Sequence, residues 1–313
     1  MLRLHSRRGI VLSLLLLAFL GVGCTGEQNA GKGTVELTVS GGTALRQGFP
    51  HKEGEVLHKF IDGWTSTFSK FIVVLGHINL SRPQTGEVVS EWKGSIMLNM
   101  KSPTIQNGTT PGTAIITELK DVPAIRLNLG FSLEAATSKT EKRSVDPKDA
   151  EDMIKNGWSV LFEGEAKRKE ETIKFRFGLA LPTVFTKCTN GKDNTLGLAV
   201  EANKKTGALI YLHAVHLFWD GLGITNARLR FDPMAAVAGS DKLVTAQELE
   251  KQDLTQLKGA DGKDLKDKNG KPIFYDDSGL LPPEKTNLLE FVRLNLRNSI
   301  HFNGLGLCNT KAK

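Results

Sequence analysis

The sequence predicts a mainly β fold, an antiparallel β-sandwich with a small helical cap in the carboxy-terminal part of the chain. Short segments in which apolar and polar residues alternate recur along the chain, a pattern typical of half-buried strands. Glycine accounts for 32 of the 313 residues and aromatic residues for only 7%, which favours strands and turns over a helical bundle. The chain is 40% hydrophobic and 24% charged, a composition that excludes a disordered chain and a multi-span membrane protein.

Eight stretches predict the strands in chain order. Residues 34–40 place Val35, Leu37 and Val39 on one face, as in a half-buried strand. Residues 68–80 form a longer and more apolar stretch, continuously apolar at 71–75, which predicts a central strand covered on both faces. Alternation returns in two single strands and two hairpins: 96–100, 125–133, 158–166 with 172–181, and 196–202 with 208–218.

Capping patterns predict the helices. Asp146 and Pro147 begin a short helix that ends at Asn156-Gly157. Asp232-Pro233 begins another helix after the last strand. A polar cap followed three residues later by glutamate begins two more, at Thr245 with Glu248 and at Asn287 with Glu290. The predicted organisation has four parts: a signal peptide at 1–23, a flexible tether at 24–33, a β-sandwich-like domain at 34–228 and a helical cap at 229–313.

The amino-terminal leader predicts export. Arg3, Arg7 and Arg8 precede an apolar stretch at residues 10–20 and small residues before Cys24. The stretch is too short for a mature membrane-spanning helix and is typical of a secretory signal peptide. Its end resembles the bacterial lipobox, which implies cleavage before Cys24 and lipidation of its sulfur. Gly21 departs from the leucine that is usual three residues before the lipobox cysteine. The alternative is an ordinary signal peptide with an incidental cysteine.

Location and partners follow from this leader. Lipidated Cys24 predicts a protein attached to a membrane of the bacterial cell envelope, with its body outside the cytoplasm and the outer membrane favoured over the inner. The net charge of +7 falls to +4 once the three leader arginines are removed. That is too weak a charge for its length to indicate a nucleic-acid partner. The sequence leaves a protein or ligand partner unidentified.

Two further cysteines remain if Cys24 carries lipid. In an exported chain, Cys188 and Cys308 most simply form one disulfide, which would hold the carboxy-terminal tail against the β region. Two unrelated free thiols are the alternative.

His213 and His216 form an H-x-x-H pair. With His301 and Asp220 they are candidate ligands for zinc or copper, which imidazole suits. On a straight strand, residues three apart point to opposite faces, so a shared ion requires the strand to bulge or to end near His216. The alternative is that these histidines are hydrogen-bonded packing residues.

From about residue 207 the chain resembles an uncharacterised family of bacterial exported lipoproteins. The matching motifs are LHAVHLFWD at 212–220, LRFD at 229–232, VTAQEL at 244–249 and the segment from 287 to 308. Relatives carry an acid where this chain has Val215, and polar residues where it has Leu305 and Leu307. The resemblance therefore implies that this chain lacks candidate ligands, or groups that orient ligands, at these three positions. The family has no assigned activity, so the resemblance implies architecture more than function.

Relatives also carry an EF-hand-like loop where this chain has residues 237–248. Such a loop needs oxygen ligands at positions 1, 3 and 5, glycine at 6 and glutamate at 12. Val237 and Gly239 occupy the first two ligand positions and Lys242 replaces the glycine, while Asp241 and Glu248 are retained. The sequence therefore predicts a helix–loop–helix that does not bind calcium.

The function that the sequence favours is a lipid-anchored envelope protein with a non-catalytic binding or scaffolding role. A zinc- or copper-binding protein is the first alternative and an envelope hydrolase is the second. Two observations argue against the hydrolase. The sequence has neither a nucleophile elbow nor an HExxH motif, and no serine, histidine and aspartate can be grouped into a catalytic triad from the sequence alone.

Overall fold

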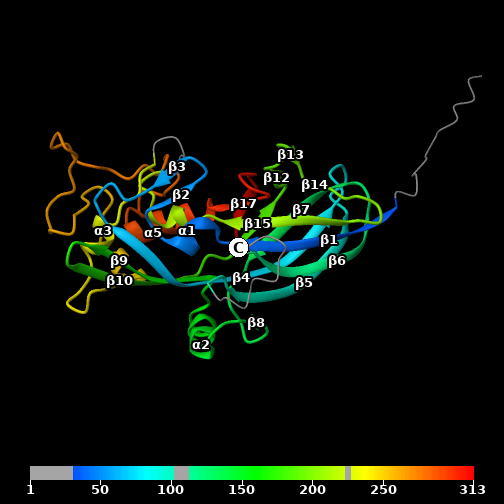
Figure 1. The fold of residues 1–313 in the computed structure, drawn as a ribbon, viewed down its shortest axis with the longest axis horizontal. Coiled ribbons are helices and arrows are strands. Elements are labelled where there is room, and N and C mark those ends of the chain that lie inside the picture. The colour runs from blue at the N-terminus through cyan, green and yellow to red at the C-terminus, as the bar shows by residue number, and fades with distance from the viewer. Residues whose placement is uncertain (1–30, 102–112, 223–226) are drawn as a thin grey trace, which may run out of the picture.

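Two β-sheets dominate the regular structure of the chain and helices are few, so the predicted mainly β class is confirmed (Figure 1). The structure is a computed structural model that describes residues 31–101, 113–222 and 227–313. The predicted signal peptide at 1–23 and Cys24 lie outside the described residues. One continuous apolar core draws side chains from both sheets, which is the arrangement of a β-sandwich.

The smaller sheet has the strand order β17-β15-β1-β6. Its strands are β1 (Lys32–Ser40), β6 (Thr113–Pro123), β15 (Lys205–Leu212) and β17 (Ile300–Phe302). Val35, Leu37 and Val39 of β1 are fully buried, as the alternation predicts. The strand begins at Lys32, so the last two residues of the predicted tether belong to the sheet.

The larger sheet is built around β4 (Thr65–Ser81), the predicted central strand. One edge of β4 pairs with β5 (Val88–Asn99), and the other pairs first with β9 (Val160–Arg168) and then with β7 (Arg126–Leu133). Phe71, Val73 and Leu75 enter the core between the sheets. Ile72 and Val74 enter a second cluster beneath a helix. The apolar run is therefore covered on both faces, as predicted.

Shorter strands complete the larger sheet and two small hairpins. They are β8 (Glu141–Arg143), β10 (Glu171–Leu179), β11 (Thr183–Thr186), β14 (Leu198–Ala199), β16 (Leu243–Thr245) and β18 (Asn309–Ala312) in the sheet, with β2 (His51–Glu53) and β3 (Val56–His58) in one hairpin and β12 (Thr189–Asn190) and β13 (Thr195–Leu196) in the other. The predicted hairpin of 158–166 with 172–181 is confirmed, because β9 and β10 pair antiparallel.

The second predicted hairpin, 196–202 with 208–218, is wrong. β14 pairs with β7 in the larger sheet, whereas β15 pairs with β1 and β17 in the smaller one. Alternation identifies a strand and its buried face, but it does not choose the neighbour. Alternation does not predict strand direction either. Three pairs are parallel within otherwise antiparallel sheets: β1 with β15, β5 with β8, and β10 with β16.

Helices are few and short. They are α1 (Gly42–Gln47), α2 (Pro147–Asn156), the 3₁₀ helix η2 (Ala214–Phe218), α3 (Asp232–Ala235), α4 (Ala246–Leu249) and α5 (Leu288–Arg297). The side chain of Asp146 accepts a hydrogen bond from the Lys148 amide at 2.9 Å, and Gly157 ends α2 at φ 62°, as predicted. Asn287 caps α5 in the same way. Within the described ranges, no helix has the length and apolarity needed to cross a membrane.

The segment from residue 229 onward contributes to both sheets. β16 and β18 belong to the larger sheet and β17 to the smaller one. The beginning of β1 lies at one end of the long axis, while α3 and the yellow-to-orange loops lie towards the opposite end (Figure 1). Of its strands, β17 pairs with β15 and brings His301 next to the end of that strand.

Candidate histidine cluster

The first two histidines lie where β15 ends. β15 stops at Leu212, and η2 begins at Ala214 with His213 as its first flanking residue. In a 3₁₀ helix, residues three apart lie on the same side. His213 and His216 therefore lie on the same side, with ring centres 5.8 Å apart. On a straight strand they would point to opposite faces.

His301 comes from β17, next to the end of β15. β17 pairs with β15 so that His301 lies opposite Tyr211. Its ring centre lies 4.7 Å from that of His213 and 6.0 Å from that of His216. Two segments far apart in the sequence, the junction of β15 with η2 and strand β17, thus bring the three candidate histidines together. We call these three residues the histidine cluster.

One ring nitrogen of each imidazole is buried without a hydrogen-bond partner: Nε2 of His213, Nδ1 of His216 and Nδ1 of His301. The rings also hydrogen-bond the backbone of Gly304, Asn295 and Leu305, respectively. His216 is 5% exposed and His301 is 3% exposed. Each ring therefore keeps an unused nitrogen inside the protein.

Burial keeps these imidazoles neutral. Desolvation, with a smaller contribution from the positive charge of His301, lowers the pKa of His213 to about 3. Desolvation together with His213 and His301 lowers the pKa of His216 to about 2. Burial also lowers the pKa of His301. At neutral pH all three rings are uncharged, which is the protonation state that ligates metals.

Asp220, the fourth candidate ligand, is engaged elsewhere. Its Oδ1 accepts a hydrogen bond from the Arg228 amide at 2.7 Å, and its Oδ2 pairs with Nε of Arg230 at 2.6 Å. This carboxylate is therefore occupied by an arginine that is itself largely buried.

The ring spacing is close to that of a metal site without matching it. Three imidazoles at ~2.0 Å on one tetrahedral ion have ring centres about 5 Å apart. Only the distance between His213 and His301 is that short. Among the residues that the structure describes, no three histidine, cysteine, aspartate or glutamate side chains already stand as a ligand set. Binding would require the ring of His216 to approach by about 1 Å.

Two further histidines lie near the cluster and were missed by the sequence interpretation. His51 and His58 are paired across the β2–β3 hairpin and stack with ring centres 5.0 Å apart. A positive charge on His58 contributes to the lowered pKa of His213. An H-x₆-H spacing around the turn at Gly54 is the pattern that would have indicated the pair.

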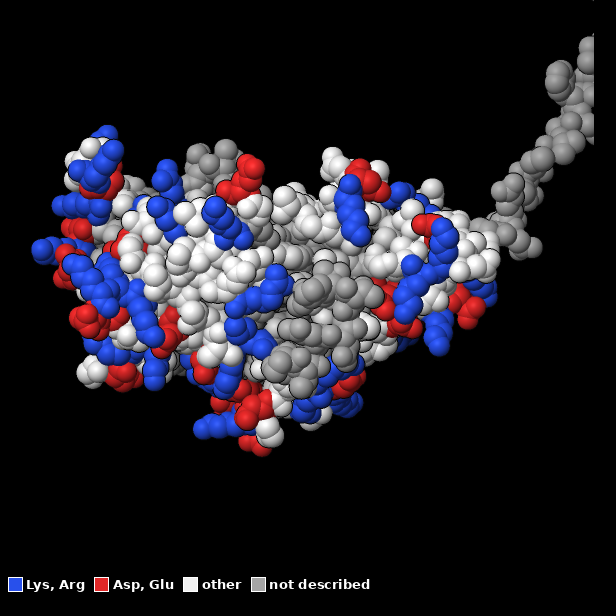
Figure 2. Space-filling view, in the orientation of Figure 1, with Lys and Arg blue, Asp and Glu red and all other residues white. Residues whose placement is uncertain are grey.

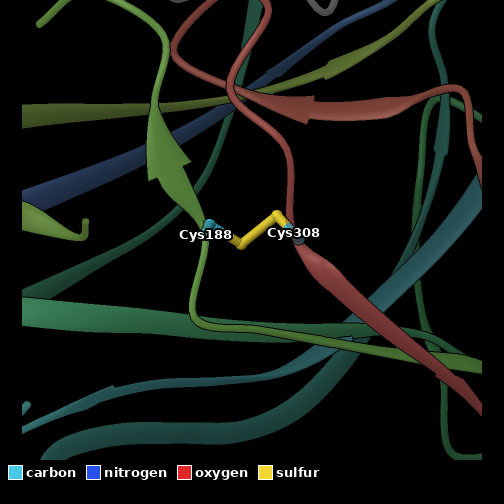
Figure 3. Close-up of a disulfide and its surroundings, with 2 residues drawn as sticks. All are labelled: Cys188 and Cys308. Carbon is cyan, nitrogen blue, oxygen red and sulfur yellow. A yellow bond between two sulfur atoms is a disulfide. The ribbon is translucent and has the colours of Figure 1, made fainter. Parts of the chain in front are cut away.

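The predicted disulfide between Cys188 and Cys308 is confirmed (Figure 3). It joins residues 120 positions apart in the sequence, and Cys188 is fully buried. Next to it, the Thr189 amide donates to the Leu307 carbonyl at 2.7 Å. The bridge therefore fixes the tail that carries His301 to the body of the protein.

The helix–loop–helix at 237–248 persists as packing between α3 and α4. Lys242 takes the left-handed conformation, φ 55°, at the position where a calcium loop has glycine. The Glu248 carboxylate accepts hydrogen bonds from the amide and hydroxyl of Thr245, at 2.8 and 3.2 Å. The carboxylate that would be the bidentate calcium ligand instead caps α4.

Comparison with known proteins adds no further assignment. No protein-family model matches this chain, and no curated protein or solved structure is significantly similar to it.

Acidic and basic side chains are interspersed at both ends of the face that Figure 2 shows.

Proposed function

We propose that this chain is an exported protein, lipid-anchored to the bacterial cell envelope through Cys24, whose body is a non-catalytic binding module outside the cytoplasm. The observation that supports export most strongly is the disulfide between Cys188 and Cys308. Such bridges persist in oxidising compartments and are rare in the cytosol. The arginines, apolar stretch and Cys24 of the leader point to the same compartment.

The shape of the body suits such an anchor. β1 starts at one end of the long axis, and α3 with its neighbouring loops lies towards the other (Figure 1). A lipid attached a few residues before β1 would hold the first end at the membrane. The end that carries α3 would then face away from the lipid. We infer that ligands are met on the side away from the membrane, with the outer membrane favoured as the site of attachment.

Metabolic labelling with palmitate in a bacterial host that processes lipoproteins tests the anchor. The wild-type protein should incorporate the label and fractionate with membranes, whereas Cys24→Ser should do neither. Cys308→Ser is the matched control, because it also removes a thiol but leaves the leader intact, and it should be labelled like the wild type. Equal labelling of Cys24→Ser and the wild type would rule out lipidation at Cys24.

A further inference from the structure

We propose that His213, His216 and His301 form a binding site for one divalent transition metal ion, zinc or copper. This inference rests on the proposed binding function and names its ligand. The three residues come from the end of β15, from η2 and from β17. Their ring centres are 4.7 to 6.0 Å apart.

The unused ring nitrogens carry the argument. A neutral imidazole has one N–H donor and one lone pair. Nε2 of His213, Nδ1 of His216 and Nδ1 of His301 are buried without a hydrogen-bond partner. Buried polar atoms are nearly always paired. Unlike the other unpaired side-chain atoms of the described residues, these three belong to histidine rings packed against one another. A cation bound by their lone pairs accounts for all three.

The backbone contacts of the rings have the form found around metal ligands. A metal-bound histidine almost always donates its other N–H to a carbonyl or carboxylate, which fixes the tautomer and the ring orientation. The rings here hydrogen-bond the backbone of Gly304, Asn295 and Leu305, respectively. Each ring is thus oriented by the protein and keeps its second nitrogen available.

The framework is firm enough to hold the site while the rings adjust. The amide of His213 donates to the carbonyl of Ser299 at 3.0 Å, and His301 lies in register with Tyr211. Oδ1 of Asn303 accepts from the Leu209 amide at 2.8 Å. These bonds tie β17 to β15, so His301 is held beside His213 while the ring of His216 is left to approach them.

The chemistry of the set selects the ion. Three imidazoles and no carboxylate suit zinc and copper, whereas calcium and magnesium prefer oxygen ligands. Asp220 is paired with Arg230 and does not change this balance. A three-histidine set leaves a fourth coordination position for water.

Calorimetric titration of the metal-free mature chain in detergent, at pH 7.5, tests the site with zinc and copper separately. We expect one ion per chain for at least one of the two metals. His213→Gln, His216→Gln and His301→Gln should each weaken binding by about tenfold or more. His77→Asn is the matched control, because His77 lies on β4 with its side chain 57% exposed. Asparagine tolerates the positive φ of that position. The metal affinity of the His77→Asn variant should therefore equal that of the wild type.

X-ray absorption of the metal-loaded wild type gives a readout that needs no substitution and decides the matter if a variant fails to fold. It should show imidazole nitrogens from three histidines at about 2.0 Å. The proposal is overturned by the absence of saturable binding of either metal, by unchanged affinity in all three folded variants, by an equal loss in His77→Asn, or by fewer than three imidazoles. The Cys24→Ser chain should bind metal normally, so failure of the anchor and failure of the metal site are distinguishable.

Discussion

Burial controls the chemistry of single residues in the histidine cluster. His216 stacks on Trp219 with ring centres 3.7 Å apart and is 5% exposed. A charged imidazole would lose its hydration there, and the neighbouring histidines would repel it. The pKa of His216 is therefore lowered to about 2 and that of His213 to about 3. The neutral form is maintained well below neutral pH.

These lowered pKa values predict an acid-sensitive fold in the metal-free protein. An unfolded histidine has a pKa of about 6.5, so below that pH the unfolded chain takes up protons that folded His213 and His216 exclude. Stability is then fully present above pH 6.5 and is lost as the pH falls towards the folded pKa values. We expect the free energy of unfolding to drop by about 2–3 kcal/mol between pH 6.5 and pH 5.

Urea unfolding of the metal-free protein at several pH values measures this loss. His216→Gln removes one of the two groups, so its loss should be roughly half that of the wild type. His77→Asn should behave like the wild type. Identical pH dependence in the wild type and His216→Gln would show that the buried rings do not control acid sensitivity.

At the residue scale, the sequence named these three histidines as candidate ligands but left open whether and how they meet. His213, His216 and His301 are indeed together. Their shared side depends on β15 ending at Leu212 and on the 3₁₀ geometry that follows. Alternation cannot locate such an end to one residue. Asp220 is a plausible ligand in sequence, but its pairing with Arg230 is a tertiary contact.

At the scale of elements, α2 is attached to the larger sheet by charge as well as by apolar packing. Asp149 is 3% exposed. Its carboxylate pairs with Nζ of Lys70 at 2.9 Å and with the Arg176 guanidinium at 3.2 Å. Glu163 pairs with the same two cations. One turn further along α2, Met153 is fully buried in the apolar cluster that includes Ile72 and Val74 of β4.

Asp149→Ala should destabilise the protein by about 1–3 kcal/mol, because it leaves two partly buried cations with one carboxylate fewer. The matched control is Asp152→Ala. Asp152 pairs with the same Arg176 at 2.9 Å, but its side chain is 37% exposed, so the expected loss is below about 1 kcal/mol. Urea unfolding of both variants compares them. A loss at Asp152 equal to or larger than that at Asp149 would contradict this account of α2.

The segment between α3 and α4 should not bind calcium. Glu248 caps α4 through Thr245, and Val237 and Gly239 offer no side-chain oxygen. Calorimetric titration with calcium should give no saturable heat for the wild type or for Glu248→Gln. Saturable binding in the wild type that disappears in Glu248→Gln would show that the loop has kept its calcium site.

At the scale of the whole molecule, local patterns predicted the elements better than their arrangement. β1, β4, α2 and α5 follow from alternation and caps contained within each segment. The parallel pairing of β1 with β15 joins Thr34 to Lys205, and no local pattern encodes such a choice. The approach of the β2–β3 hairpin to the histidine cluster is equally non-local, which is why His51 and His58 were missed.

The disulfide should support both the global fold and the metal site. Closing a loop of 120 residues stabilises the folded state by about 4–5 kcal/mol in the chain-entropy model. Replacing Cys188 and Cys308 with serine together should lower the unfolding temperature and weaken metal binding, because the tail that carries His301 is released. The double variant avoids reductants that compete for metal. Unchanged stability and unchanged metal affinity would show that the bridge supports neither.

The most direct test of the histidine site is anomalous diffraction from crystals of the mature chain grown with zinc, and separately with copper, with data collected at each metal edge. The account predicts one strong anomalous peak for at least one metal, within about 2.0–2.1 Å of ring nitrogens from His213, His216 and His301. The account would be contradicted if neither metal gave an anomalous peak at these rings in crystals grown near neutral pH, or if the peaks lay only at other residues.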